Sequence, residues 1–86
     1  MLQRGRVVLS LAGRDKDRLM AVLAVEPDGY LMVADGKERP IQRPKRKNPR
    51  HVAQTRRTLW EKAMATNREL RRALSQPETG GDEAAQ

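Results

Sequence analysis

Residues 19–34 read LMAVLAVEPDGYLMVA, and this stretch decides the fold class. Its first seven residues form a continuous apolar run of strand length, which is too short for a convincing helix. The turn signal Pro27-Asp28-Gly29 ends that run, and residues 30–34 then read as a second strand. Because residues 19–25 are apolar on both faces, we expect this strand at the centre of a small barrel or sandwich.

Shorter strands are expected on both sides of this stretch. Residues 6–9 (RVVL) predict a first strand, and residues 10–18 form a charged, glycine-bearing loop. Asp35-Gly36 is a strong signal for a two-residue hairpin, because a type I′ turn needs a positive φ at both positions. We therefore expect residues 37–42 to return as a strand, which its proline confines to a sheet edge or makes irregular.

Two prolines bracket residues 45–48, so this densely charged piece should be extended rather than helical. Successive side chains of an extended segment point to opposite sides, so Lys45 and Lys47 should face one way and Arg46 the other. Residues 50–53 could supply a short closing strand.

Helical signals begin after residue 57. The segments TLWE (58–61) and TNRE (66–69) both fit the capping box, in which a Thr and a Glu three residues later satisfy backbone amides at a helix start. We expect two short helices, at about 59–65 and about 67–75. A single helix through the whole region is the competing interpretation, because the residues between the two oppose it only weakly.

The apolar residues of this region should pack against the strands. Helical spacing places Trp60 and Met64 on one face of the first helix, and Leu70 and Leu74 on one face of the second. We expect Trp60 to dock its helix on the barrel, although its ring could instead stack on a base. Residues 77–86 are acidic and lack large apolar side chains, so we expect a disordered tail.

Positive charge is concentrated in the basic block, residues 37–57, which reads KERPIQRPKRKNPRHVAQTRR. Nine basic residues and one acidic residue give this block a net charge of +8, while the whole chain carries +7. A dense cationic segment repels itself unless a polyanion neutralises it, and nucleic acid is the commonest polyanion in a cell.

The composition limits the alternatives. The chain has 86 residues, enough for one small domain, and no cysteine, so thiolate metal sites and disulfides are excluded. It holds a single histidine, no phosphate-cradling loop and no nucleophile–base pair, so we expect a non-enzymatic protein without a metal or another cofactor. The apolar runs are too short for a signal sequence or a membrane span, and a cytoplasmic protein is expected.

Aromatic residues are nearly absent, with Tyr30 and Trp60 the two in the chain. Proteins that bind single strands by stacking need exposed aromatic platforms. We therefore expect recognition mostly through phosphate and shape, on structured RNA. Charge alone does not exclude duplex DNA, but the sequence has no helix-turn-helix or zinc motif.

These residues also carry a family likeness. Residues 5–18 (GRVVLSLAGRDKDR), 22–25 (VLAV) and 28–52 (DGYLMVADGKERPIQRPKRKNPRHV) resemble a KOW-type RNA-binding domain. The chain is similar to small bacterial KOW proteins related to a large-subunit ribosomal protein of archaea and eukaryotes. Residues 66–74 resemble the helical extension of the bacterial members. One departure is Asp17, where the KOW loop normally has glycine; Asp tolerates the left-handed backbone conformation better than most residues.

The resemblance implies a mainly β fold, a small SH3-like barrel of about five strands. We expect the barrel and its basic extension in residues 1–54, a helical appendage in residues 55–76 and the tail in residues 77–86. The implied partner is RNA, and specifically ribosomal RNA or the ribosome. No membrane or small-molecule ligand is expected, and we expect a monomer.

The expected RNA-binding residues are cations of the loop and of the basic block, together with the lone histidine. They are Arg14, Lys16, Arg18, Lys37, Arg39, Arg43, Lys45, Arg46, Lys47, Arg50 and His51. The first three resemble the RNA-facing positions of the KOW loop. The alternative function is a protein-interaction module that docks on transcription or translation machinery. A merely solvated charged segment and a peripheral membrane role are weaker alternatives.

Overall fold

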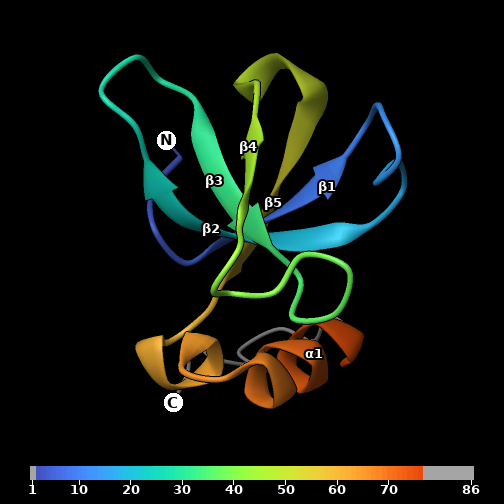
Figure 1. Cartoon of the computed structure of the whole chain (residues 1–86), viewed down its shortest axis with the longest axis vertical. Coiled ribbons are helices and arrows are strands. Elements are labelled where there is room, and N and C mark those ends of the chain that lie inside the picture. Colours follow the sequence, from blue (N-terminus) through green and yellow to red (C-terminus); the bar gives the residue numbers. More distant parts are fainter. Residues whose placement is uncertain (1, 77–86) are drawn as a thin grey trace.

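Five strands form one antiparallel sheet in the order β4-β3-β2-β1-β5 (Figure 1). The structure is a computed structural model, and it describes residues 2–76. The strands are β1 (Arg6–Ser10), β2 (Leu19–Val25), β3 (Leu31–Ala34), β4 (Lys45–Lys47) and β5 (Val52–Thr58). The first four strands follow one another as a meander, and β5 returns to pair with β1. The predicted fold class is confirmed: a mainly β, small barrel-like fold with five strands.

Two irregularities bend the sheet. The register shifts between Arg6 and Val8 where β1 pairs with β5, and between Val22 and Ala24 where β2 pairs with β3. Such shifts bend a strand and increase its local twist, which lets a short sheet curl. One apolar cluster is built almost entirely from residues of the strands.

Apolar side chains are buried on both sides of the sheet. The first cluster contains Val8, Met20, Val22, Leu31 and Val33, each at most 1% exposed. The second joins the strands to the C-terminal segment and contains Val7, Ala21, Ala34, Leu59, Met64, Leu70 and Ala73. Alternate residues of β2 thus pack in different clusters, which explains why residues 20–23 are all apolar, while Leu19 and Val25 at the ends of the strand are exposed. The predicted central position of this strand is confirmed.

The C-terminal segment forms two short helices below the barrel (Figure 1), as predicted. They are η2 (Glu61–Met64), a 3₁₀ helix, and α1 (Asn67–Ser75), while a further 3₁₀ turn, η1 (Pro49–His51), joins β4 to β5. Thr66 caps α1, and its side chain accepts a hydrogen bond from the Glu69 backbone N–H at 3.1 Å. The corresponding cap at Thr58 is absent, because Thr58 is the last residue of β5.

Trp60 is not the docking residue that its spacing predicts. Its side chain is 49% exposed, whereas the neighbouring Leu59 and the following Met64 are buried in the second cluster. The helical face expected to contain Trp60 and Met64 does not form, since η2 begins only at Glu61.

Residues 37–42 do not form the predicted returning strand. Gly36 has a φ of 80°, but Asp35 does not adopt a positive φ, so no type I′ turn forms. Instead the Asp35 carboxylate accepts hydrogen bonds from the backbone N–H groups of Lys37 (2.9 Å) and Arg39 (2.8 Å). These bonds fold residues 35–44 into an irregular connection, and β4 begins only at Lys45.

The last strand is longer than the short closing strand expected at residues 50–53. β5 runs to Thr58, four residues beyond the expected end of the barrel at residue 54. Residues 49–51 form η1 instead of a strand. The expected disorder of residues 77–86 lies outside the described residues.

Buried Arg57 ties β5 to the end of α1. Its Nη2 group donates to the Ala73 carbonyl oxygen at 2.5 Å, and Nη1 donates to that of Gln76 at 3.3 Å. The last carbonyl groups of a helix lack partners within the helix, and a cation there is also favoured by the helix dipole. Arg57 therefore serves the fold, although it belongs to the basic block.

The first turns of α1 hold the connection between β3 and β4. Asn67 Oδ1 accepts from the Ile41 backbone N–H at 2.8 Å, and Arg71 Nη1 donates to the Gly36 carbonyl oxygen at 2.8 Å. Gly36 lies directly against α1, since a Cβ atom there would lie 2.5 Å from the Asn67 carbonyl oxygen.

We predict that Gly36→Ala destabilises the protein more than Gly29→Ala. Both glycines have a positive φ, which costs Ala about 1–2 kcal/mol. Position 29 is otherwise a matched control, because a Cβ there meets nothing within 4 Å. At position 36 the clash with α1 should add about 1–3 kcal/mol. Thermal or urea unfolding of both variants tests this, and equal losses would show that α1 does not press on Gly36.

Candidate nucleic-acid interface

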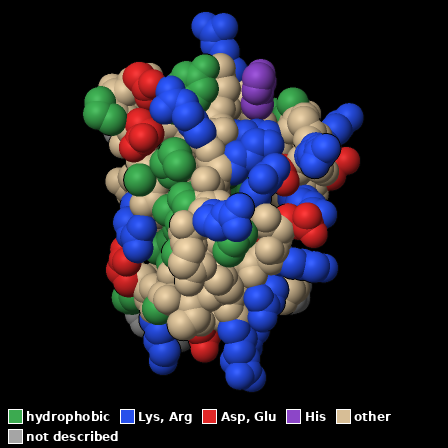
Figure 2. Space-filling model, in the orientation of Figure 1, with side chains coloured by type: hydrophobic (Ala, Val, Ile, Leu, Met, Phe, Trp, Pro, Cys, Tyr) green, Lys and Arg blue, Asp and Glu red, His purple; other side chains and the backbone are tan. Residues whose placement is uncertain are grey.

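The predicted RNA-binding residues come from three neighbouring segments. These are the β1–β2 loop (residues 11–18), the β3–β4 loop (residues 35–44) and the β4–η1 segment (residues 45–51). The first and third lie side by side, because the Leu11 backbone N–H donates to the His51 carbonyl oxygen at 2.8 Å. Figure 2 shows Lys and Arg side chains over this face, with the histidine near its upper end.

The β1–β2 loop is folded by its own backbone. The backbone N–H of Asp17 donates to the Ser10 carbonyl oxygen at 2.8 Å, and that of Lys16 donates to the carbonyl oxygen of Gly13 at 3.2 Å. Asp17 has a φ of 72°, which is the left-handed conformation expected at this position. The loop thus forms without a glycine there.

A buried carboxylate joins the three segments. Asp15 of the β1–β2 loop has a side chain only 4% exposed, and its Oδ2 atom lies 3.0 Å from Lys45 Nζ and 3.4 Å from Arg39 Nε. Burial disfavours the charged carboxylate, but the hydrogen bonds and positive charges of Lys45 and Arg39 outweigh it and lower the pKa of Asp15. Two predicted RNA-binding cations are therefore engaged by this carboxylate, with their own side chains 29–31% exposed.

Lys47 is also engaged internally. The predicted alternation along β4 is confirmed, since Arg46 is exposed while Lys45 and Lys47 point to the other side. That side faces the β1–β2 loop, where Lys47 Nζ donates to the Ala12 carbonyl oxygen at 2.7 Å. Lys47 is 5% exposed, and burial together with the nearby charge of Lys45 lowers its pKa.

Two more of the predicted cations have acidic partners. Arg18 Nη1 lies 3.4 Å from Asp35 Oδ2, and Arg46 is paired with Asp28. Both arginine side chains nevertheless stay more than 40% exposed, and Arg46 lies over the ring of Tyr30.

The other predicted residues are exposed and have no ion-pair partner within residues 2–76. They form the exposed cation set, which consists of the five cations Arg14, Lys16, Lys37, Arg43 and Arg50 together with the histidine His51. The prediction also left out some exposed cations, namely Arg56 on β5 and Arg68 and Arg72 on α1. Their charge was visible in the sequence, but no local pattern tells which cations face solvent.

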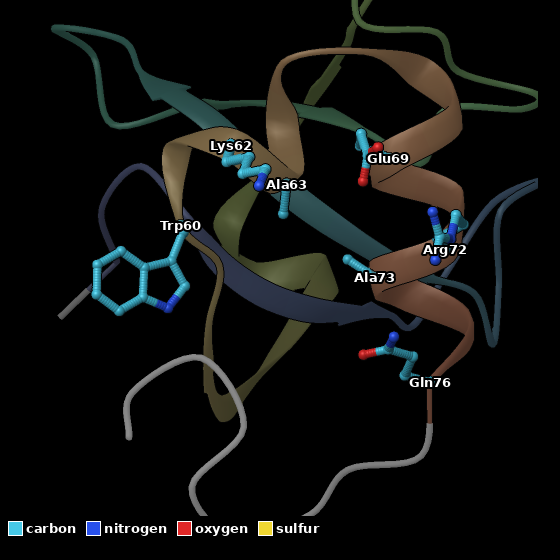
Figure 3. A pocket seen from close by; sticks show the side chains of 7 residues that line it. All are labelled: Trp60, Lys62, Ala63, Glu69, Arg72, Ala73 and Gln76. Atoms are coloured by element: carbon cyan, nitrogen blue, oxygen red, sulfur yellow. The ribbon is translucent and has the colours of Figure 1, made fainter. Parts of the chain in front are cut away.

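A hollow of about 430 Å³ lies between η2 and α1 (Figure 3). It is lined by Trp60, Lys62, Ala63, Glu69, Arg72, Ala73 and Gln76. The Trp60 indole stands at one side of the hollow, opposite the side chains of α1 (Figure 3). Two cations and one acid surround it, so the hollow combines a large apolar ring with a small positive excess.

Within residues 2–76, no group of three or more His, Asp or Glu side chains is placed to hold a metal ion, and no helix is long and apolar enough to span a membrane. Comparison with models of known protein families gives no match, and no curated protein matches the chain either. The resemblance to KOW domains therefore stays a prediction.

We predict that Asp15→Asn destabilises the protein by about 1–3 kcal/mol at pH 7, because two cations lose their buried partner. The pKa of Asp15 is lower in the folded chain than its ordinary value of 3.8. Its stabilisation is therefore complete above that value and is lost as the pH falls through the lower folded pKa. Thermal unfolding from pH 7 to pH 2 measures this, and the difference in stability between wild type and variant should shrink and disappear as the pH falls below about 4.

The matched control for this prediction is Asp28→Asn, which removes an exposed ion pair of the same type. Exposed pairs are screened by solvent, so this variant should unfold close to the wild type. Equal stability of Asp15→Asn and wild type at pH 7 would contradict a stabilising role for the buried carboxylate.

Proposed function

We propose that this chain is a non-enzymatic RNA-binding protein that contacts structured RNA, in particular ribosomal RNA. The observation that carries the proposal is the exposed cation set, six side chains without an ion-pair partner within residues 2–76. They project from three loops that one small barrel holds together. Unpaired cations on fixed loops match a ligand that presents phosphates at fixed spacings.

The buried ion pairs assign different tasks to the predicted residues. Arg39, Lys45 and Lys47 hold the β1–β2 loop against the β3–β4 loop and β4. The exposed cation set supplies phosphate contacts. Arg18 and Arg46 belong to neither group, because each is paired with an aspartate but is still exposed. In this division of tasks, Asp15 and its partners position the loops, and the exposed side chains around them bind the RNA.

The surface favours structured RNA over an extended single strand. Tyr30, directly before β3, is the one aromatic residue next to the sheet strands β2 and β3, and Arg46 lies over its ring. A row of aromatic platforms for successive bases is therefore missing from residues 2–76. The resemblance to bacterial KOW proteins adds the more specific proposal of a cytoplasmic protein associated with the ribosome.

The alternative, a protein-interaction module of the transcription or translation machinery, is favoured by one observation. Trp60 is 49% exposed beside the hollow between η2 and α1. Large aromatic residues at the surface are common anchors of protein interfaces. Ribosome association that survives nuclease treatment and is lost in Trp60→Ala would favour this alternative over RNA contact.

We predict salt-dependent binding of the purified protein to a ribosomal RNA fragment. If about five phosphates are neutralised, log K should fall against log[salt] with a slope of about −3.5 to −4.5. Filter binding between 50 and 300 mM salt measures the slope. The double variant Arg14→Ala/Lys16→Ala should make the slope less negative by about 2.

The matched control is Arg68→Ala/Arg72→Ala, which removes the same charge from α1. This control should leave the slope nearly unchanged, because α1 lies outside the three loop segments. A flat salt response would overturn the electrostatic account. Equal effects of the two double variants would show attraction by net charge rather than by the exposed cation set.

A further inference from the structure

Arg46 and Tyr30 form a stacked pair on the outside of the barrel. The guanidinium carbon of Arg46 lies 4.1 Å from the centre of the Tyr30 ring, a distance typical of a cation–π contact. The ring is itself fixed, because Asn48 Nδ2 donates to the Tyr30 hydroxyl at 3.1 Å. Tyr30 is thus held by two residues of one chain segment, one at β4 and one directly after it.

The orientation of Arg46 is fixed from a second direction. Its Nη2 group donates to Asp28, and this hydrogen bond lowers the pKa of Asp28 and raises the pKa of Arg46, so both stay charged at neutral pH. Asp28 is held in turn by the Tyr30 backbone N–H, which donates to its Oδ1 atom at 3.0 Å. The turn between β2 and β3 therefore positions both the ring below Arg46 and the carboxylate beside it.

The surroundings of Arg46 disfavour a phosphate ligand. Asp28 already neutralises the guanidinium, and the negative charge of Glu26 also acts on it. A phosphate would approach two carboxylates, whereas a nucleobase is neutral and meets no such repulsion. The Arg46 side chain is 49% exposed although its guanidinium carbon lies over the Tyr30 ring, so part of the guanidinium remains accessible to a flat ligand.

We infer that Arg46, held on Tyr30, is the stacking platform for one unpaired nucleobase of the bound RNA. The inference rests on the RNA binding proposed above and specifies its target as a duplex with a bulged or looped-out base. A planar guanidinium stacks on bases, and unpaired bases are where proteins read structured RNA. Arg50 follows in the same chain segment and is exposed, so a cation is available for a flanking phosphate.

The test compares two sets of RNA hairpins. One set carries a single bulged nucleotide, with each of the four bases and with 2-aminopurine in turn, and the other is fully paired. Wild-type protein should bind the best bulged hairpin roughly tenfold more tightly than the paired one. Binding should also change the 2-aminopurine fluorescence, because stacking alters its emission.

Arg46→Lys is the decisive variant, because it keeps the charge and removes the planar surface. It should lose the preference for bulged RNA, keep its affinity for paired RNA and unfold at nearly the wild-type temperature. Arg50→Lys is the matched control, and it should keep the preference because a phosphate contact needs no planar group. Tyr30→Phe should keep part of the preference, since the ring remains but loses the hydroxyl that Asn48 holds.

The outcomes separate this inference from the proposed function. Salt-sensitive binding to both hairpin sets without preference or fluorescence change would overturn the stacking platform and leave RNA binding intact. Retention of the preference in Arg46→Lys would overturn the platform as well. Failure to bind any hairpin or ribosomal RNA at low salt would overturn the proposed function and, with it, this inference.

Discussion

The central strand β2 must bury apolar side chains on both of its faces, and the rest of the molecule is arranged around that requirement. One face is covered by the curled sheet itself, in the cluster that contains Met20 and Val22. The other needs a second layer, which Leu59, Met64 and Leu70 supply. The C-terminal segment therefore contributes side chains to the core. Its attachment also fixes the β3–β4 loop, because α1 bonds to Ile41 and Gly36.

Acidic side chains organise the basic surface. Asp15 and Asp35 are buried; Asp15 pairs with Lys45 of the β4–η1 segment, and Asp35 pairs with Arg18 of the β1–β2 loop and binds a backbone N–H of its own loop. Asp28 does the same at the turn between β2 and β3, where it is paired with Arg46. The positive charge of the chain is thus divided between cations that shape the loops and cations that remain available outside. A smaller number of free charges at fixed positions gives more geometric selectivity than a larger flexible set.

Sequence patterns predicted what depends on near neighbours in the chain. The apolar runs located β1, β2 and β3, and the cap at Thr66 located the start of α1. The prediction for residues 37–42 was wrong because the Asp35 carboxylate bonds backbone amides that a hairpin would have used differently. The local signal of Asp35-Gly36 favoured the hairpin, whereas the observed loop also depends on the contact of Gly36 with α1, about 30 residues later in the chain.

The candidate site was predictable in composition and not in geometry. The concentration of cations was visible at once, but the engagement of Lys45 by Asp15 joins residues 30 positions apart. Alternation along an extended segment correctly separated Arg46 from Lys45 and Lys47. It could not tell which side faces the protein, because that depends on where the β1–β2 loop folds. The exposure of Trp60 was not predictable either, because it depends on β5 continuing to Thr58 instead of a helix beginning at residue 59.

The pairing of β1 with β5 has a consequence for biosynthesis. Ser10 lies opposite Val52, and Arg6 lies opposite Thr58, so the first strand needs a neighbour that the ribosome adds some fifty residues later. Until then the nascent chain presents an open strand edge and an uncovered apolar side of β2, both of which invite association with other chains. Completion of the fold therefore waits for the residues of α1 to leave the exit tunnel, and the unfinished barrel stays exposed until they do.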